Sequence, residues 1–135
     1  MKYKRVVIKL GGETLSGENG FGINTEKAEQ LALRIKKVHD LGAEIVIVMG
    51  AGNLWRGAKG QTKGMDRSIA DEIGMLATVM NCLALEDALK KLNIGVRLHT
   101  SVAMQPIAEP YSRLRADYQL KKGYIVIVGG GTGHP

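Results

Sequence analysis

The sequence is poor in cysteine, aromatic residues and long apolar runs. The chain has a single cysteine, Cys82, so it cannot form an internal disulfide, and such a cysteine content is typical of a protein in the reducing cytoplasm. Because the neighbours of Cys82 in the sequence are apolar, we expect this residue in the core. Aromatic residues make up only 4%, too few for a base-stacking platform, so we expect no nucleic-acid partner. The apolar run after the basic amino terminus has about five residues, shorter than the ~7–15 of a signal-peptide core. No run approaches the ~18 apolar residues of a membrane span, so we expect no membrane partner either.

The residues that are present indicate a folded, soluble chain. Residues 1–135 correspond to a single domain, and a content of 44% apolar and 24% charged residues excludes general disorder. The net charge of +6 fits phosphate ligands, nucleic acid or an anionic surface, and does not choose between them. Glycine is abundant at 18 residues, about twice the usual ~7%, which indicates several places where the backbone turns tightly or approaches another group.

Three short, β-branched apolar runs each end in glycines. They are Arg5–Leu10 before Gly11-Gly12, Glu44–Met49 before Gly50-Ala51-Gly52, and Tyr124–Val128 before Gly129-Gly130-Gly131. Because polar residues do not alternate through these runs, they predict strands that are covered on both faces. A weaker candidate strand spans Gly95–Ser101.

Helical spacing of apolar residues predicts helices over Thr25–Leu41, Asp66–Leu92 and Tyr111–Lys122. In the long second helix, the residues expected on one buried stripe are Ile69, Ile73, Leu76, Met80, Leu83, Leu89 and Leu92. Strands and helices alternate, which predicts an α/β architecture with a mostly parallel sheet between helical layers. The last predicted strand is followed only by its glycine turn, so we expect the architecture to be incomplete at the carboxyl terminus.

The glycine turns form the candidate functional site. In open parallel sheets, ligands bind beyond the carboxyl ends of the strands, where all three turns are expected to lie. Glycine lacks a side chain, so backbone N–H groups can point at an anion, and three such turns indicate a polyphosphate or nucleotide site. The sequence contains neither the Walker A pattern nor the GxGxxG fingerprint, which argues against the usual mononucleotide and dinucleotide folds.

Two basic residues flank these glycines. Lys9 lies in the first apolar run, and a lysine near the end of a buried strand is costly unless its ammonium group reaches an anion. We therefore favour a phosphate partner for Lys9 over a pair with Glu13 or exposure to water. Arg56 follows the second turn, where a guanidinium group either clamps phosphate oxygens or stacks on Trp55, and the sequence does not decide between these.

Other polar residues have either a ligand-binding role or a purely structural one. Asp71 either accepts hydrogen bonds from sugar hydroxyls or follows the preference of acids for the start of a helix, and its spacing alone favours the second. Thr132 either donates to a phosphate or base, or caps a following helix. Three scattered histidines, His39, His99 and His134, lack the spacing of a zinc site.

Four segments in one order carry a resemblance to a known family. They are VVIKLGGE, MGAGNLWRG, DEIGMLATVMNCLALEDAL and IVGGGTGHP. In this combination the chain resembles the amino-terminal half of bacterial uridylate (UMP) kinases of the amino-acid-kinase superfamily, along all of its 135 residues. The resemblance implies a three-layer α/β/α sandwich and ATP- and Mg²⁺-dependent phosphorylation of UMP to UDP. It further implies a cytoplasmic homohexamer, with GTP as activator and UTP as inhibitor.

The resemblance also assigns residues. ATP is expected at Lys9, Leu10, Gly11, Gly12, Gly52 and Arg56, with Lys9 as the catalytic residue. UMP is expected at Ala51, Asp71, Thr132, Gly133, His134 and Pro135. Activation by GTP is expected to involve Gly17, Glu18, Asn19, Gly20, Phe21 and Gly22. No residue of the chain is assigned to a metal.

The chain departs from the family pattern in places. KLGG replaces the common KLSG, Ala51 replaces a glycine and His134 replaces an asparagine. The second half of family members, which carries an aspartate near the phosphates and the adenine pocket, has no counterpart in this sequence. Two alternatives therefore remain: a nucleotide-binding module without catalysis, and a related kinase that acts on a carboxylate or carbamate.

Overall fold

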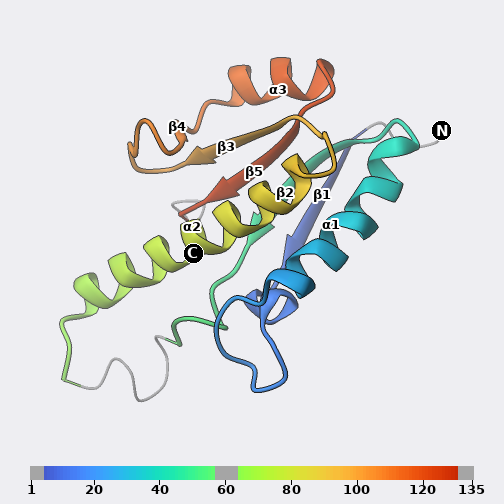
Figure 1. The fold of residues 1–135 in the computed structure, drawn as a ribbon. Coiled ribbons are helices and arrows are strands. Elements are labelled where there is room, and N and C mark those ends of the chain that lie inside the picture. Colours follow the sequence, from blue (N-terminus) through green and yellow to red (C-terminus); the bar gives the residue numbers. More distant parts are fainter. Residues whose placement is uncertain (1–4, 57–63, 131–135) are drawn as a thin grey trace.

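The computed structural model describes residues 5–56 and 64–130, which form one parallel sheet with helices on both faces (Figure 1). In chain order the elements are β1 (Arg5–Leu10), the 3-10 helix η1 (Gly12–Leu15), α1 (Thr25–Asp40), β2 (Glu44–Met49), α2 (Arg67–Lys90), β3 (Val96–Thr100), β4 (Glu109–Pro110), α3 (Arg113–Lys121) and β5 (Ile125–Gly129). The strand order is β1-β2-β5-β3-β4, and every neighbouring pair is parallel. The predicted helices and strands are confirmed to within two residues at each end, whereas η1 and β4 were not predicted.

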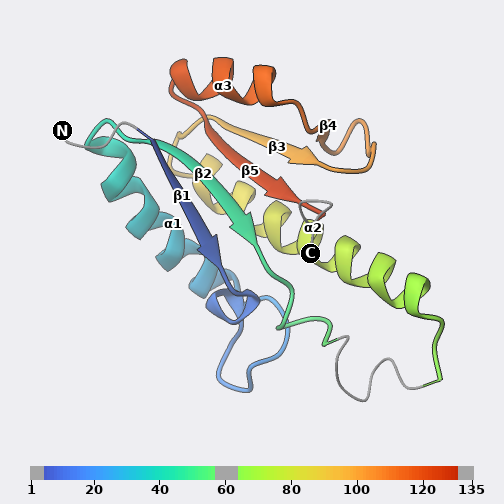
Figure 2. The ribbon, with the colours of Figure 1, turned by 180° about the vertical axis from the view of Figure 1, so that it is seen from behind.

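The sheet lies between two unequal helical layers (Figures 1 and 2). Helices α1 and α2 pack side by side over one face, where Ile45, Ile47 and Ile127 of the sheet form the main core with residues of both helices. Helix α3 covers β2 and β5 on the other face through a smaller cluster around Leu120 and Val126. The predicted α/β architecture with a parallel sheet is therefore confirmed.

Short polar side chains define where each helix begins. Asn24 caps α1, Asp66 caps α2 and Ser112 caps α3, and in each case a side-chain oxygen accepts a hydrogen bond from the backbone N–H three residues later. Such a bond satisfies one of the free donors of the first helical turn. Helix α1 ends just before Gly42, whose φ of 95° is the left-handed conformation that favours glycine.

The buried stripe predicted for α2 is wrong in part. Its large residues Ile69, Leu76, Met80 and Leu83 are 37–52% exposed. The buried residues of α2 include the small Ala77, Cys82 and Ala88 beside the larger Val79, Leu85 and Leu89. Small side chains let the helix approach the sheet closely, and because α2 is apolar on nearly all sides, spacing alone did not identify the inner face.

Helix α2 also has the length and composition of a membrane span, the single such case within the described ranges. Core helices pass the same test, and α2 packs against β2, β3 and β5 along its inner face. We interpret it as a core helix with an apolar outer face.

One face of the sheet is only partly covered. Val6 and Ile8 of β1 pack against the main core, but Val7, on the opposite face, is 60% exposed. A cavity of about 640 Å³ lies between α3 and this face, lined by apolar side chains including Val46 and Val128. The prediction that the strands are covered on both faces is therefore wrong for β1, because α3 is short and lies over β2 and β5.

Candidate functional site

The three glycine turns follow three neighbouring strands. Because β1, β2 and β5 are adjacent and parallel, their carboxyl ends lie along one edge of the sheet (Figure 2). The first two turns are in direct contact, since the Gly50 amide donates to the Leu10 carbonyl at 2.8 Å. The strand order thus confirms the predicted common edge for the described glycines, while Gly131 lies outside the described residues.

Gly12 is buried where the first turn meets the second. A Cβ on Gly12 would overlap the side-chain oxygen of Asn53 and would lie 2.8 Å from the Gly52 amide nitrogen. The absence of a side chain at Gly12 is therefore what lets the two turns pack together. A Cβ on Gly52, in contrast, would meet no atom within 4 Å.

This difference predicts opposite results for two alanine substitutions. Gly12→Ala is expected to lower the free energy of unfolding by about 1–3 kcal/mol, because the added methyl group overpacks a closed contact. Gly52→Ala is expected to stay within about 0.5 kcal/mol of the unaltered chain. Urea unfolding of both variants measures the difference, and equal stability of the two would contradict the packing described for Gly12.

Helix α2 supports the turns from beneath with polar side chains on one face. Thr78 accepts a hydrogen bond from the Gly130 amide at 2.7 Å, and Asn81 donates to the Gly50 carbonyl at 2.8 Å. Cys82 lies against Gly129, where a Cβ would come within 3.0 Å of its sulfur. These residues are three and four apart and so share a helix face. Sequence reasoning missed Thr78 and Asn81, although two polar residues at this spacing on an apolar helix are a usable signal.

Cys82 is confirmed as a core residue. It is fully buried, and its burial raises the pKa of the thiol to about 12, with a further contribution from the charge of Glu86. The thiol is therefore neutral at physiological pH and acts as a small packing group.

Lys9 is exposed, which corrects one step of the sequence argument. It is the fifth residue of β1 and shares with Val7 the face that the helices leave open. Burial therefore does not force its ammonium group toward an anion. Within the described residues Lys9 forms no salt bridge, with Glu13 or any other acid, so its charge is available beside the first glycine turn.

The second turn orients Arg56 and Trp55 differently. Arg56 is exposed, and its Nε donates to the Gly52 carbonyl at 2.9 Å, which holds the guanidinium group next to the turn. The Trp55 indole N–H donates to the Ala70 carbonyl at 3.1 Å, and its ring lies against Gly74 of α2. Trp55 thus attaches the second turn to the amino-terminal half of α2.

The remaining predicted residues lie at several positions. Leu10 is half-buried at the end of β1, Ala51 is half-buried in the second turn, and Asp71 is exposed in the second turn of α2. Figure 2 shows the amino-terminal part of α2 projecting beyond the ends of the strands. Thr132, Gly133, His134 and Pro135 lie outside the described residues.

The segment from Gly17 to Gly22 joins the second turn. The Gly22 amide donates to the Asn53 carbonyl at 2.9 Å, and the Asn53 side chain donates back to the Gly22 carbonyl at 2.8 Å. Within the segment, the Asn19 side chain accepts from the Phe21 amide, and the Phe21 ring is 64% exposed. The carboxyl end of this segment is therefore part of the same edge of the sheet as the glycine turns.

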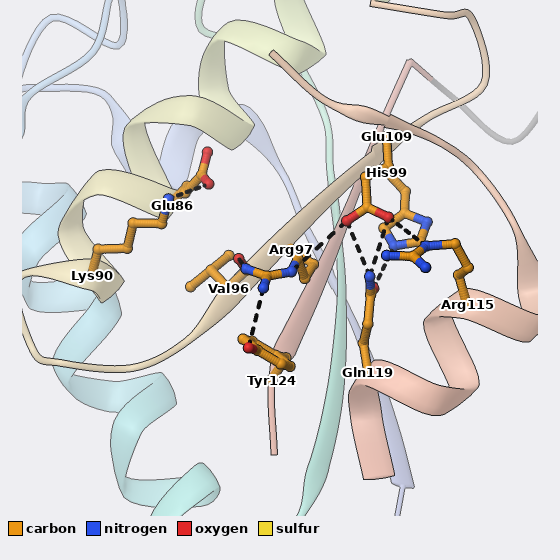
Figure 3. Close-up of polar contacts among 9 residues, drawn as sticks. All are labelled: Glu86, Lys90, Val96, Arg97, His99, Glu109, Arg115, Gln119 and Tyr124. Atoms are coloured by element: carbon orange, nitrogen blue, oxygen red, sulfur yellow. Dashed lines mark hydrogen bonds and ion pairs between the residues drawn. The ribbon is translucent and has the colours of Figure 1, made fainter. Parts of the chain in front are cut away.

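A polar cluster lies away from the turns, at the β3–β4 edge (Figure 3). Glu109 accepts hydrogen bonds from Arg115 and Gln119, and Gln119 in turn accepts from the fully buried His99 at 2.7 Å. Partial burial raises the pKa of Glu109, but the bonds from Arg115 and Gln119 outweigh this effect and leave the pKa below its usual value. The cluster fixes α3 to the edge strands. Sequence reasoning missed it because its members are scattered along the chain.

The described residues contain no group of three histidine, cysteine or acidic side chains that is able to hold a metal ion. Around the turns they offer backbone amides, one lysine and one arginine, a donor set that suits anionic oxygens rather than a cation. The described residues therefore do not fit a protein-bound Mg²⁺.

Comparison with known proteins assigns the chain to a family. The model of the Amino acid kinase family matches residues 4–135, and the chain belongs to this family. It is 53% identical over 135 residues to a uridylate kinase of Limosilactobacillus reuteri, a match that covers all of this chain and 56% of the relative. The chain thus spans little more than half the length of the curated relatives it matches.

Solved structures agree with this assignment. The structure superposes on UMP kinase from Bacillus anthracis with a TM-score of 0.91 and 46% identity, covering 98% of this chain and 55% of that one. UMP kinase from Ureaplasma parvum gives a TM-score of 0.89 with 34% identity, over 100% of this chain and 59% of that one. An aspartate kinase from Synechocystis, at 18% identity and a TM-score of 0.66, shares the fold.

Proposed function

We propose that this chain provides the phosphate-binding edge of a UMP kinase, which transfers the γ-phosphoryl group of ATP to UMP. The observation that carries the proposal is the alignment of the glycine turns of β1, β2 and β5 on one edge, flanked by the free charge of Lys9 and by Arg56. The 53% identity to a uridylate kinase supports UMP as the acceptor.

The chemistry requires little beyond positioning and charge. An oxygen of the UMP phosphate attacks the γ-phosphorus of ATP, the bond from that phosphorus to the bridging oxygen breaks, and ADP leaves. The attacking phosphate is already an anionic nucleophile, so no general base is needed. Lys9 and the amides of Gly11 and Gly12 stabilise negative charge on the transferred group, and Arg56 holds the ATP phosphates. Leu10 and Gly52 complete the ATP side.

UMP binds along this edge in our proposal, between α2 and the second turn. Asp71 accepts hydrogen bonds from the ribose hydroxyls, and the Ala51 backbone meets the acceptor phosphate. The other UMP contacts come from Thr132, Gly133, His134 and Pro135, which are assigned through the resemblance. The substrate would be ATP with its Mg²⁺, whose positive charge would offset that of the phosphates, and the described residues would hold the phosphates rather than the ion.

Regulation and assembly are also proposals. The segment Gly17–Gly22 transmits activation by GTP, with UTP as an inhibitor, and its bonds to Asn53 provide the route to the second turn. The exposed stripe of Ile69, Leu76, Met80 and Leu83 on α2 supports a homo-oligomer, a hexamer in the cytoplasm, because a stripe of large apolar residues favours burial against a second copy.

A combined binding and turnover experiment tests the function. Calorimetry with UMP and with Mg-ATP is paired with an ADP-release assay using UMP, CMP, acetylglutamate or carbamate as acceptor. ADP release that depends on UMP is expected, and release with a carboxylate or carbamate alone would assign a related kinase. Nucleotide binding without ADP release would favour a binding module, an alternative supported by the 56% share of the relative's length. Absence of binding to both nucleotides would refute the proposal.

A further inference from the structure

Two asparagines form a closed pair beneath the glycine turns. Asn53, in the second turn, is 1% exposed, and Asn81, on α2, is fully buried. Their side chains exchange reciprocal hydrogen bonds, at 3.1 Å from Asn53 to Asn81 and at 2.8 Å in the other direction. We call this pair the amide clasp.

The clasp uses its remaining donors on backbone carbonyls. Asn81 donates to the Gly50 carbonyl and Asn53 donates to the Gly22 carbonyl, both at 2.8 Å. Each side-chain amide has two N–H donors, so all four donors of the pair are satisfied. The side-chain oxygen of Asn53 also lies against Gly12, with no room for a Cβ between them. One buried pair therefore contacts the segments after β1, before α1 and after β2.

The bond to Gly50 has a directional consequence. In a trans peptide the C=O and the following N–H point in opposite directions. Because Asn81 holds the Gly50 carbonyl toward α2, the N–H of Ala51 points away from the helix. Within the described ranges this N–H donates to no protein acceptor, so it is a free donor on the edge of the sheet.

Packing alone does not account for this arrangement. Two apolar side chains of similar shape fill such a space at comparable stability, because a buried polar pair loses its hydration. Leucine, however, does not fix the direction of a carbonyl group. The two asparagines, in contrast, fix the orientation of the Gly50–Ala51 peptide and of the Gly22 carbonyl.

We infer that Asn53 and Asn81 are positioning residues: the clasp turns the Ala51 N–H toward the phosphate of a bound nucleotide and links this donor to the segment Gly17–Gly22. The assignment of a nucleotide phosphate rests on the proposed function. The orientation of the two backbone segments does not depend on it.

The test replaces both asparagines by leucine, as Asn53→Leu/Asn81→Leu. The double variant removes both members of the pair together and leaves the Gly50 and Gly22 carbonyls without their side-chain donors. It is expected to fold, and to bind UMP or Mg-ATP at least tenfold more weakly by calorimetry. In ¹⁵N spectra the Ala51 amide shift is expected to change, and the Gly22 amide to exchange with solvent at least tenfold faster. Asn81→Asp keeps the shape of this side chain, loses its donors to both Gly50 and Asn53, and serves as the second variant if the first does not fold. Ile35→Val in α1 controls for a buried change remote from the clasp and is expected to leave all three measurements unchanged.

The outcomes separate the clasp from the function. The inference would be overturned if the folded variants kept the nucleotide affinity, the Ala51 amide shift and the Gly22 exchange rate of the unaltered chain. The amide clasp would then contribute only packing. If the unaltered chain binds neither nucleotide, the proposed function fails, and the Ala51 and Gly22 signals alone decide on the clasp. Changes of the same size in Ile35→Val would also overturn the inference.

Discussion

Replacing Lys9 by methionine is expected to slow UMP-dependent ADP formation by about 100- to 1000-fold, which corresponds to about 3–4 kcal/mol in the barrier. The ammonium group is the one positive charge at the end of β1, beside the amides of Gly11 and Gly12, and no protein acid neutralises it among the described residues. Methionine keeps the length of the side chain and removes the charge. Because Lys9 is exposed, the free energy of unfolding is expected to change by less than about 0.5 kcal/mol.

The measurement is an ADP-release assay, run on the 135-residue chain and on a chimaera that adds the part of a curated relative outside the alignment. Lys37→Met, an exposed lysine on α1 away from the turns, is the matched control and is expected to keep full turnover. Turnover of Lys9→Met close to that of Lys37→Met would remove Lys9 from the mechanism.

Truncating Ile127 to alanine is expected to produce the largest loss of stability, about 3–4 kcal/mol. Ile127 is fully buried in β5, and its backbone lies in register with Ile47 of β2 and Leu98 of β3. The surrounding strands are fixed by hydrogen bonds on both sides, so the cavity left by the missing methyl and ethyl groups does not collapse.

Val7→Ala on β1 provides the comparison for this truncation. Val7 is also a strand residue, but it is 60% exposed on the open face, and its truncation is expected to cost about 0.5 kcal/mol or less. Urea unfolding of both variants measures the two changes in free energy. Similar losses would show that the open face is covered in solution.

Most of the elements of the fold were accessible from local sequence. Asn24 precedes the first helix, Gly42 follows it, and glycines mark the ends of β1, β2 and β5. Each of these residues has a physical reason to stand at the end of an element, and the structure has element ends at these places. The strand order was not accessible, because nothing local states that β5 enters between β2 and β3. The open face of β1 was missed for the same reason: it depends on the length and position of α3.

The glycine turns of the candidate site could be predicted from the sequence, but the side chains that hold these turns in place could not. Backbone turns show as glycine in the sequence, whereas Asn53 and Asn81 are 28 residues apart and gain meaning only when α2 packs beneath the second turn. A phosphate partner was predicted for Lys9 because a buried lysine needs an anion, whereas the structure shows that Lys9 is exposed. The buried stripe of α2 was predicted from helical spacing, but the helix is apolar on nearly all sides, so spacing did not separate the buried Leu89 from the exposed Leu76 and Met80.

The position of β5 has a consequence for synthesis on the ribosome. β2 and β3 are not neighbours, so β1–β2 and β3–β4 are joined in the sheet only through β5, which follows these four strands in the chain. While Ile125–Gly129 is still inside the ribosome, the nascent chain can form only two separate strand pairs, β1–β2 and β3–β4. Insertion of β5 between β2 and β3 then joins the two pairs into one sheet. Until that moment the turn after β2 has no neighbouring strand on one side, so the edge that carries the glycine turns is incomplete until β5 is in place.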